Sequence, residues 1–139
     1  MNCIESGHGN PMTGIDTGFF FALREGDPRA IQIFQEARLA ISVLTLFELR
    51  RIALRRGFEW EEFKEPLTRL GVIAEISPEV ADRAAFASYS AGLPAVDALI
   101  IASLQVVGCD KIYSRDPHFA KYRSKDVEII LLNGPSAAV

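Results

Sequence analysis

Short apolar runs, rich in Ile, Val and Leu, alternate along this chain with longer stretches in which apolar residues recur every three or four positions. The short runs are typical of buried strands, and the longer pattern predicts amphipathic helices. The strands are predicted at residues 12–16, 39–43, 72–76, 109–113 and 127–132. This alternation predicts an α/β fold, a three-layer sandwich in which helices cover a mainly parallel five-stranded sheet.

Capping residues and prolines mark the starts of the predicted helices. Asp27 stands before Pro28, an arrangement in which the carboxylate caps the helix that the proline begins. Thr45 and Glu48 match a capping box at the start of a helix that runs to residue 56. The stripe of the helix after Asp27 that should face the core consists of Ala30, Ile31, Phe34 and Ala37. Further helices are predicted near residues 19–23, 59–70, 78–91, 95–107 and 117–122.

Residues 93–119 place two acids at opposite ends of one helix and strand. Asp97 lies in the first turn of the predicted helix, and Asp116 follows the next strand, in a capping position before Pro117. In a parallel sheet this helix returns the chain from the C-terminal edge to the N-terminal edge. Its rise of ~20 Å nearly matches the ~16 to 20 Å of the strand. Both acids are therefore expected at the C-terminal edge, where open α/β sheets bind ligands.

Two more acids follow earlier strands, Asp16 after the first and Glu48 after the second. Each of the four acids has an ordinary explanation, as a helix cap or as a partner of the helix dipole. Four carboxylates at close range would nevertheless repel one another and raise their pKa values. A hard divalent cation removes that repulsion, and no lysine is placed to do so instead. The sequence therefore predicts a Mg²⁺ or Mn²⁺ site made by Asp16, Glu48, Asp97 and Asp116.

The overall composition suits a single folded domain in a reducing compartment. The chain has 139 residues, of which 49% are hydrophobic, and we expect a domain at residues 12–133 between tails at 1–11 and 134–139. Cys3 and Cys109 show neither metal-ligand spacing nor a disulfide framework. No apolar run approaches the ~20 residues that cross a bilayer, and the N-terminus does not resemble a signal peptide. We expect a cytoplasmic protein with no membrane partner.

The net charge of −3 by itself disfavours a polyanionic partner, but it includes the four acids that are predicted to bind a metal. If four carboxylates bind metal, the rest of the chain is slightly basic, so a nucleic-acid partner is not excluded. Two groups of cations either bind phosphates or form solvated surfaces and partner contacts. These groups are Arg50, Arg51, Arg55 and Arg56, and Arg115, Lys121, Arg123 and Lys125. His118 lies close enough to Asp116 in sequence to contact the substrate, but a surface position is favoured. His8 has no assigned role, and Phe19, Phe20, Phe21 and Trp60 are interpreted as core or interface residues.

Four segments together resemble a known family, the PIN-domain nucleases, which include the VapC-type toxins of toxin–antitoxin pairs. The segments are IDTGFFFAL around Asp16, TLFELRR around Glu48, LPAVDALIIAS around Asp97 and YSRDPHF around Asp116. Their order and spacing resemble the family from residue 12 to 132, and Ser114 matches a small hydroxyl residue two positions before the fourth acid. The resemblance implies a five-stranded parallel sheet and Mg²⁺- or Mn²⁺-dependent cleavage of RNA.

The resemblance also implies roles for the five matched residues. Asp16 and Asp97 are expected to bind the metal directly, Glu48 and Asp116 directly or through water, and Ser114 to position water or phosphate. A VapC-type protein implies a homodimer and a small antitoxin that covers the active site. A stand-alone RNA-processing nuclease and a non-catalytic PIN-like binding scaffold are the alternatives within the family.

Two other classes of protein also gather acids at the C-terminal edge of a parallel sheet. A receiver-type domain would need adjacent acids after the first strand, a phosphoacceptor Asp at the middle strand and a later Lys, whereas here Asp16 stands alone. A haloacid-dehalogenase-like phosphatase would need Asp-x-Asp after the first strand, and the second of these positions is Gly18. Both departures favour the PIN-like interpretation.

Overall fold

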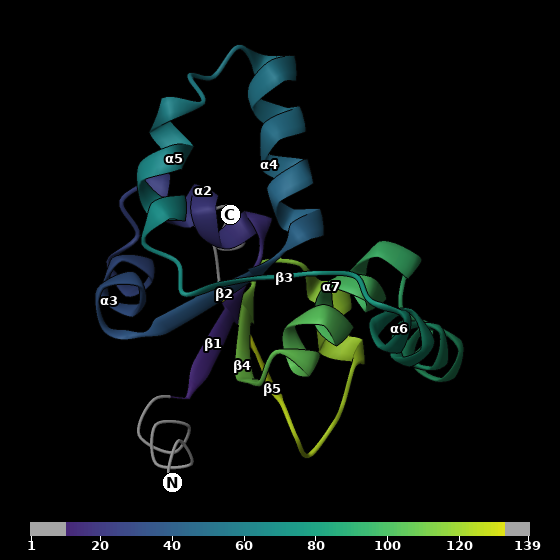
Figure 1. Ribbon diagram of the computed structural model, residues 1–139. Helices are drawn as coiled ribbons and strands as arrows, with labels where there is room; N and C mark the ends of the chain where they lie inside the picture. The colour runs from purple at the N-terminus through teal and green to yellow at the C-terminus, as the bar shows by residue number, and fades with distance from the viewer. Residues whose placement is uncertain (1–10, 133–139) are drawn as a thin grey trace, which may run out of the picture.

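A computed structural model describes residues 11–132 as one five-stranded sheet between helical layers (Figure 1). The strands are β1 (Met12–Ile15), β2 (Arg38–Ser42), β3 (Val72–Ala74), β4 (Cys109–Ser114) and β5 (Glu128–Leu131). The helices are α2 (Thr17–Arg24), α3 (Pro28–Glu36), α4 (Val43–Arg56), α5 (Glu61–Thr68), α6 (Pro78–Ala91), α7 (Ala95–Val106) and the 3₁₀-helix η1 (Pro117–Lys121). Cys3, His8 and nearly all of the two predicted tails lie outside the described residues.

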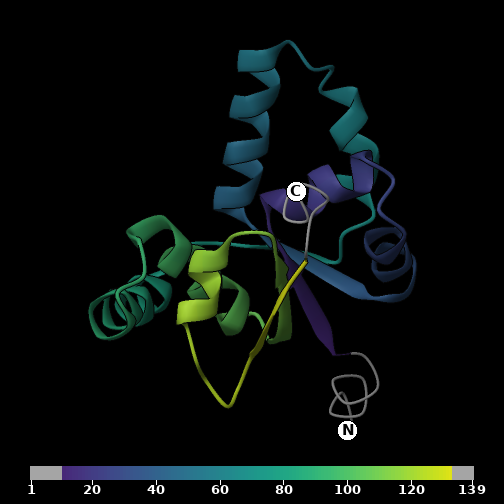
Figure 2. The ribbon, with the colours of Figure 1, turned by 180° about the vertical axis from the view of Figure 1, so that it is seen from behind.

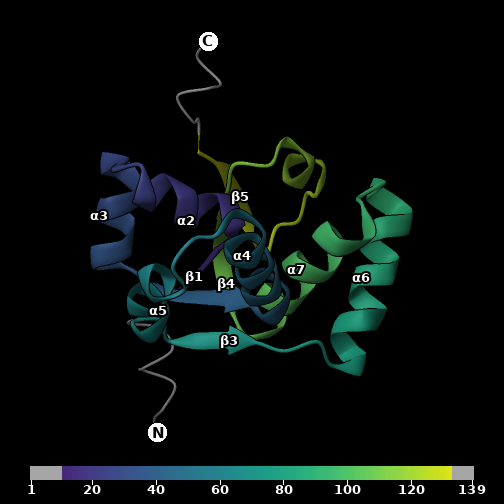
Figure 3. The same cartoon turned by 90° about the horizontal axis from the view of Figure 1, so that it is seen from above.

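All the paired strands run parallel, in the order β3-β2-β1-β4-β5. The five-stranded parallel sheet predicted from the sequence is confirmed. Because every strand ends at the same edge, the residues that follow β1, β2 and β4 come together there. Helices α6 and α7 cover one face of the sheet, and α2 and α3 lie on the other side (Figure 3). The view from behind shows η1 and β5 on the outer side of β4 (Figure 2).

Side chains alternate between the two faces of the sheet along each strand, and this divides the core into two clusters. In β2, Ala40 packs with the side chains of α6 and α7, while Leu39 and Ile41 pack with those of α2 and α4. Successive side chains of a strand point to opposite faces, so one strand contributes to both clusters. Gly14 allows α7 to approach β1 closely, because a Cβ atom there would lie 2.8 Å from Leu104 Cδ1. This close packing fixes the C-terminal half of α7 against β1.

Two details of the helices differ from the sequence-based expectations. Helix α4 begins at Val43 and is capped by Ser42, whose Oγ accepts a hydrogen bond from Leu44 N at 3.1 Å. The predicted capping box of Thr45 and Glu48 is therefore wrong, and Glu48 lies in the second turn. In α3, Ile31 is 37% exposed, and Ile33 packs against the core instead.

Helices α4 and α5 stand beyond the C-terminal edge of the sheet and form an arch there (Figure 1). An aromatic cluster packs α5 against α2, in which Phe63 is buried and its ring lies 5.9 Å from that of Trp60 and 6.2 Å from that of Phe21. The interpretation of Phe19 to Phe21 and Trp60 as core residues is confirmed. Within residues 11–132, no helix is both long and apolar enough to cross a bilayer.

Leu104→Ala should lower the free energy of unfolding by about 2 to 5 kcal/mol, because it opens a cavity between α7 and β1 where Leu104 is fully buried. Urea denaturation measures the loss. Leu54→Ala is the matched control, since Leu54 is 66% exposed and its truncation should change stability by about 0.5 kcal/mol or less. Equal losses in the two variants would contradict the packing described here.

Candidate active site

The four acids predicted from the sequence all line one cleft at the C-terminal edge of the sheet. The cleft has a volume of about 490 Å³. Its walls come from the starts of α2 and α7, from one side of α4, and from the turn between β4 and η1. The topology thus brings together side chains that are up to 100 positions apart, between Asp16 and Asp116.

Asp16 is the most buried of these acids, with 6% of its surface exposed. Its Oδ1 caps α2 by accepting a hydrogen bond from Phe19 N at 3.0 Å, and its Oδ2 accepts one from Ser114 Oγ at 2.5 Å. Burial raises the pKa of Asp16 to about 6, although the two hydrogen bonds act in the opposite direction. The charges of Asp116 and Glu48 raise the pKa of Asp16 further.

Ser114, the last residue of β4, links Asp16 to the following turn. Its side chain is fully buried. While the hydroxyl donates to Asp16, its oxygen accepts a hydrogen bond from Asp116 N at 2.9 Å. Ser114 therefore fixes the turn that carries Asp116 against the end of β1.

Asp97 and Asp116 form a second group with His118. One oxygen of each carboxylate and one ring nitrogen of His118 all lie within 4.8 Å of one another. His118 Nδ1 is 3.0 Å from Asp116 Oδ1, and that oxygen also accepts from His118 N at 2.9 Å, which caps η1. Burial raises the pKa of Asp97 to about 6, and the nearby charge of Asp116 contributes. His118, interpreted from the sequence as a surface residue, is exposed but belongs to this group.

Glu48 enters the cleft from α4 and is held by α2. Its Oε1 accepts a hydrogen bond from Thr17 Oγ1 at 2.6 Å. Because Ser42 caps α4, the Glu48 carboxylate is not used in capping and faces the other acids. Sequence reasoning did not select Thr17, and its position directly after Asp16 was the only available signal.

Arg115, which lies between Ser114 and Asp116, also lines the cleft. Its Nη2 is 2.8 Å from Glu25 Oε1 at the end of α2, and this pairing lowers the pKa of Glu25. Its aliphatic part crosses the first turn of α2 at Gly18, where a Cβ atom would lie 2.8 Å from Arg115 Cβ. Arg115 thereby ties the β4–η1 turn to both ends of α2.

The donors in this cleft suit a hard divalent cation. They are carboxylate oxygens with one adjacent imidazole, the set that Mg²⁺ and Mn²⁺ accept. The pKa values of Asp16 and Asp97 are raised by burial and by like charges, so the ionised site is unfavourable without a counterion. Asp97, Asp116 and His118 have ligand atoms near enough to share one ion.

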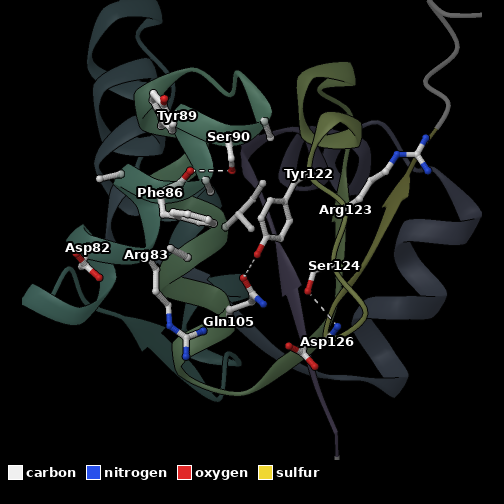
Figure 4. A pocket seen from close by; sticks show the side chains of 15 residues that line it. Asp82, Arg83, Phe86, Tyr89, Ser90, Gln105, Tyr122, Arg123, Ser124 and Asp126 are labelled. Atoms are coloured by element: carbon white, nitrogen blue, oxygen red, sulfur yellow. Dashed lines mark hydrogen bonds between the residues drawn. The ribbon is translucent and has the colours of Figure 1, made fainter.

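A larger cavity, of about 780 Å³, lies on the other side of α7, between α6 and residues 122–126 (Figure 4). Tyr122 Oη donates to Gln105 Oε1 at 2.8 Å within it, and Phe86 and Tyr89 stand on its α6 side. Its two acids, Asp82 and Asp126, are accompanied by Arg83 and Arg123. Among the described residues, its acids form no group with metal-ligand spacing.

In the metal-free protein, the free energy of unfolding of Asp16→Asn relative to the wild type should rise with pH. The folded pKa of about 6 exceeds the unfolded value of 3.8, so the folded state binds the proton more tightly. The wild type then loses stability as the pH rises from about 4 to about 6. At ~1.4 kcal/mol per pKa unit, the advantage of the variant should grow by about 3 kcal/mol over that range. Unfolding at several pH values in EDTA measures it, with exposed Asp110→Asn as control, and an advantage that does not depend on pH would contradict it.

The fold of this protein is similar to the folds of several solved protein structures. A toxin–antitoxin complex from Klebsiella pneumoniae aligns with a TM-score of 0.66 and 24% identity, over 81% of this chain and 99% of that one. VapBC2 from Rickettsia felis, bound to a promoter DNA fragment, aligns with a TM-score of 0.65 and 13% identity, over 87% and 98%. DNA-bound VapBC from Salmonella typhimurium gives 0.61 and 17%, over 87% and 98%. At these identities the structures show a shared fold.

The sequence itself matches a family model. No curated protein sequence gives a significant match. The model for the PIN domain, however, matches residues 15–125, a span that contains all four acids, Ser114 and His118. Since the match extends over most of the chain, this protein belongs to the PIN-domain family.

Proposed function

We propose that this protein is a Mg²⁺- or Mn²⁺-dependent endoribonuclease that hydrolyses RNA phosphodiester bonds. PIN domains are generally nucleases. The observation that carries the proposal is the convergence of Asp16, Glu48, Asp97 and Asp116 on one cleft, where burial and mutual charge raise the pKa values of Asp16 and Asp97. Such a group gains most from binding a cation, and the cleft is open to a substrate.

In the proposed mechanism Asp16 and Asp97 would hold the metal directly, and Glu48 and Asp116 would hold it directly or through water. The chemistry that such a cation would supply is a water of lowered pKa and neutralisation of charge on the phosphodiester. Ser114 positions Asp16 and the Asp116 turn through its two hydrogen bonds. In-line attack by water would leave 5′-phosphate and 3′-hydroxyl ends.

We further propose that the protein is the toxin of a VapBC-type pair and acts in the cytoplasm. Support comes from the fold, which it shares with chains from three toxin–antitoxin complexes. The partner would be a small antitoxin that covers the acidic cleft. A short neighbouring reading frame with a DNA-binding N-terminus would distinguish this role from that of a stand-alone RNA-processing nuclease.

Asp97→Asn should keep the fold and abolish metal-dependent cleavage of RNA, because it removes a charged ligand from the cleft. The loss of kcat should exceed the 10- to 100-fold that removal of an outer hydrogen-bond partner costs. A purified-protein assay on RNA, with Mg²⁺ or with EDTA, measures it. Asp110→Asn is the matched control, since Asp110 is exposed and lines neither the cleft nor the larger cavity. Equal cleavage rates in the two variants, or cleavage by the wild type in EDTA, would sink the proposal.

The homodimer that the resemblance implies is also proposed, with α6 as its interface. Phe86 and Tyr89 are 72% and 90% exposed, and large exposed apolar side chains mark association surfaces. The cavity beside them is bordered by acids and arginines in equal number (Asp82, Asp126, Arg83 and Arg123). A two-fold contact places such a mixed surface against its own copy, so opposite charges can pair.

Combined substitution of Phe86→Glu and Tyr89→Glu should convert the dimer to a monomer, because carboxylates without partners would then be buried in the apolar part of the interface. Light scattering after size-exclusion chromatography gives the mass. Phe47→Glu is the control, since Phe47 is 61% exposed on α4 and lies outside the α6 surface. A dimer that survives the double substitution, or one that only Phe47→Glu disrupts, would refute α6 as the interface.

A further inference from the structure

Helix α4 carries three arginines that line the same cleft as the acids. Arg51, Arg55 and Arg56 are exposed there, beyond Glu48 on the same helix. Arg50, which the sequence grouped with them, does not line the cleft. Its guanidinium lies 5.0 Å from the centre of the Trp60 ring. Arg51 and Arg55 also border a pocket on α4 that Arg50 lines, but of the four arginines only Arg50 is absent from the cleft.

The three cleft arginines retain their hydrogen-bonding capacity. Within residues 11–132 none of them lies within 4.0 Å of a carboxylate oxygen, whereas Arg24, Arg69, Arg83 and Arg115 all form ion pairs. The nearest acid on α4, Glu48, is hydrogen-bonded to Thr17 instead. An exposed guanidinium without an intramolecular anion presents a planar donor set that fits phosphate oxygens.

The spacing of these arginines fits a strand that passes over the acids. At 1.5 Å per residue, Arg51, Arg55 and Arg56 lie ~5, ~11 and ~12 Å beyond Glu48 along the axis of α4. The row therefore runs along one wall of the cleft and leads away from the acids. The acids occupy one end of the row.

We propose that Arg51, Arg55 and Arg56 bind the RNA backbone beside the scissile phosphate, an inference that rests on the proposed nuclease function. A strand whose scissile phosphate lies at the acids is continuous, and it must pass along one wall of the cleft. The α4 wall is cationic, and it adjoins Glu48 directly. These arginines contact the backbone and not the bases, so they supply affinity without sequence preference.

Binding of a labelled oligouridylate to the full-length Asp97→Asn protein, with Mg²⁺ present, tests the assignment without cleavage. The logarithm of affinity falls with the logarithm of salt concentration with a slope of about −0.7 per neutralised phosphate of a single strand. Each of Arg51→Gln, Arg55→Gln and Arg56→Gln should therefore reduce the slope by about 0.7, and the triple variant by about 2. Arg50→Gln is the matched control and should leave the slope unchanged. In the active protein, the three variants should raise KM for RNA and leave kcat unchanged.

An unchanged slope in the triple variant, with its circular dichroism intact, would overturn the inference, and so would an equal loss in Arg50→Gln. If the triple variant loses binding to polyglutamate but keeps its RNA slope, the arginines serve an acidic protein partner and the inference also fails. Should the triple variant not fold, the single variants decide. Failure of the nuclease proposal is distinguishable, because a wild type that binds RNA through these arginines without cleaving it refutes that proposal alone.

Discussion

The hydrogen bond from Ser114 Oγ to Asp16 Oδ2 connects two residues 98 positions apart, and the geometry of the cleft depends on it. It forms because β1 and β4 are parallel neighbours in which Ile15, the last residue of β1, lies opposite Tyr113, so that Asp16 comes level with Ser114, the last residue of β4. The residue after each strand then stands at the same edge of the sheet. A shift of one residue in this pairing would turn Ser114 to the opposite face of β4. Sheet register thus determines whether the acids meet.

Burial of these carboxylates has an energetic cost that local hydrogen bonds only partly offset. Asp16 accepts from Phe19 N and Ser114 Oγ, which favours its ionised form, yet desolvation is the larger effect and its pKa is still raised. The same cause dominates at Asp97, where Asp116 adds repulsion. The ionised forms of Asp16 and Asp97, which come from different elements, are thus both unfavourable in the cleft. A cation would relieve both at once, which makes the metal-free cleft a place of unfavourable electrostatics within a well-packed fold.

The sequence predicted the sheet and most helices because their signals are local. Apolar runs identified all five strands, and Asp27, Asp16 and Asp116 cap helices as their positions suggested. The start of α4 was misjudged because both Ser42 and Thr45 offer a hydroxyl. The choice between them depends on where β2 ends, and its pairing with β3 extends to Ser42 opposite Ala74. That pairing is not visible in the local pattern.

The candidate site was less predictable where a contact joins distant segments. The four acids could be brought to one edge by topology alone, but Thr17 beside Glu48 and Arg115 beside Glu25 depend on how α2 lies across that edge. The role of His118 could not be predicted from the expectation that it is exposed. A residue at the mouth of an open cleft is exposed as well, and His118 lies beside Asp97 and Asp116.

The position of the α4 arginines follows partly from the local sequence and partly from the tertiary structure. Helical spacing places Glu48, Arg51 and Arg55 on one side of the helix, yet only the tertiary structure shows that this side faces Asp97 and Asp116. The helix therefore carries an acid at the floor of the cleft and cations farther out. Charge changes sign along a single rigid element, so the distance between the Glu48 carboxylate and the three arginines is set by the helix and not by a flexible loop.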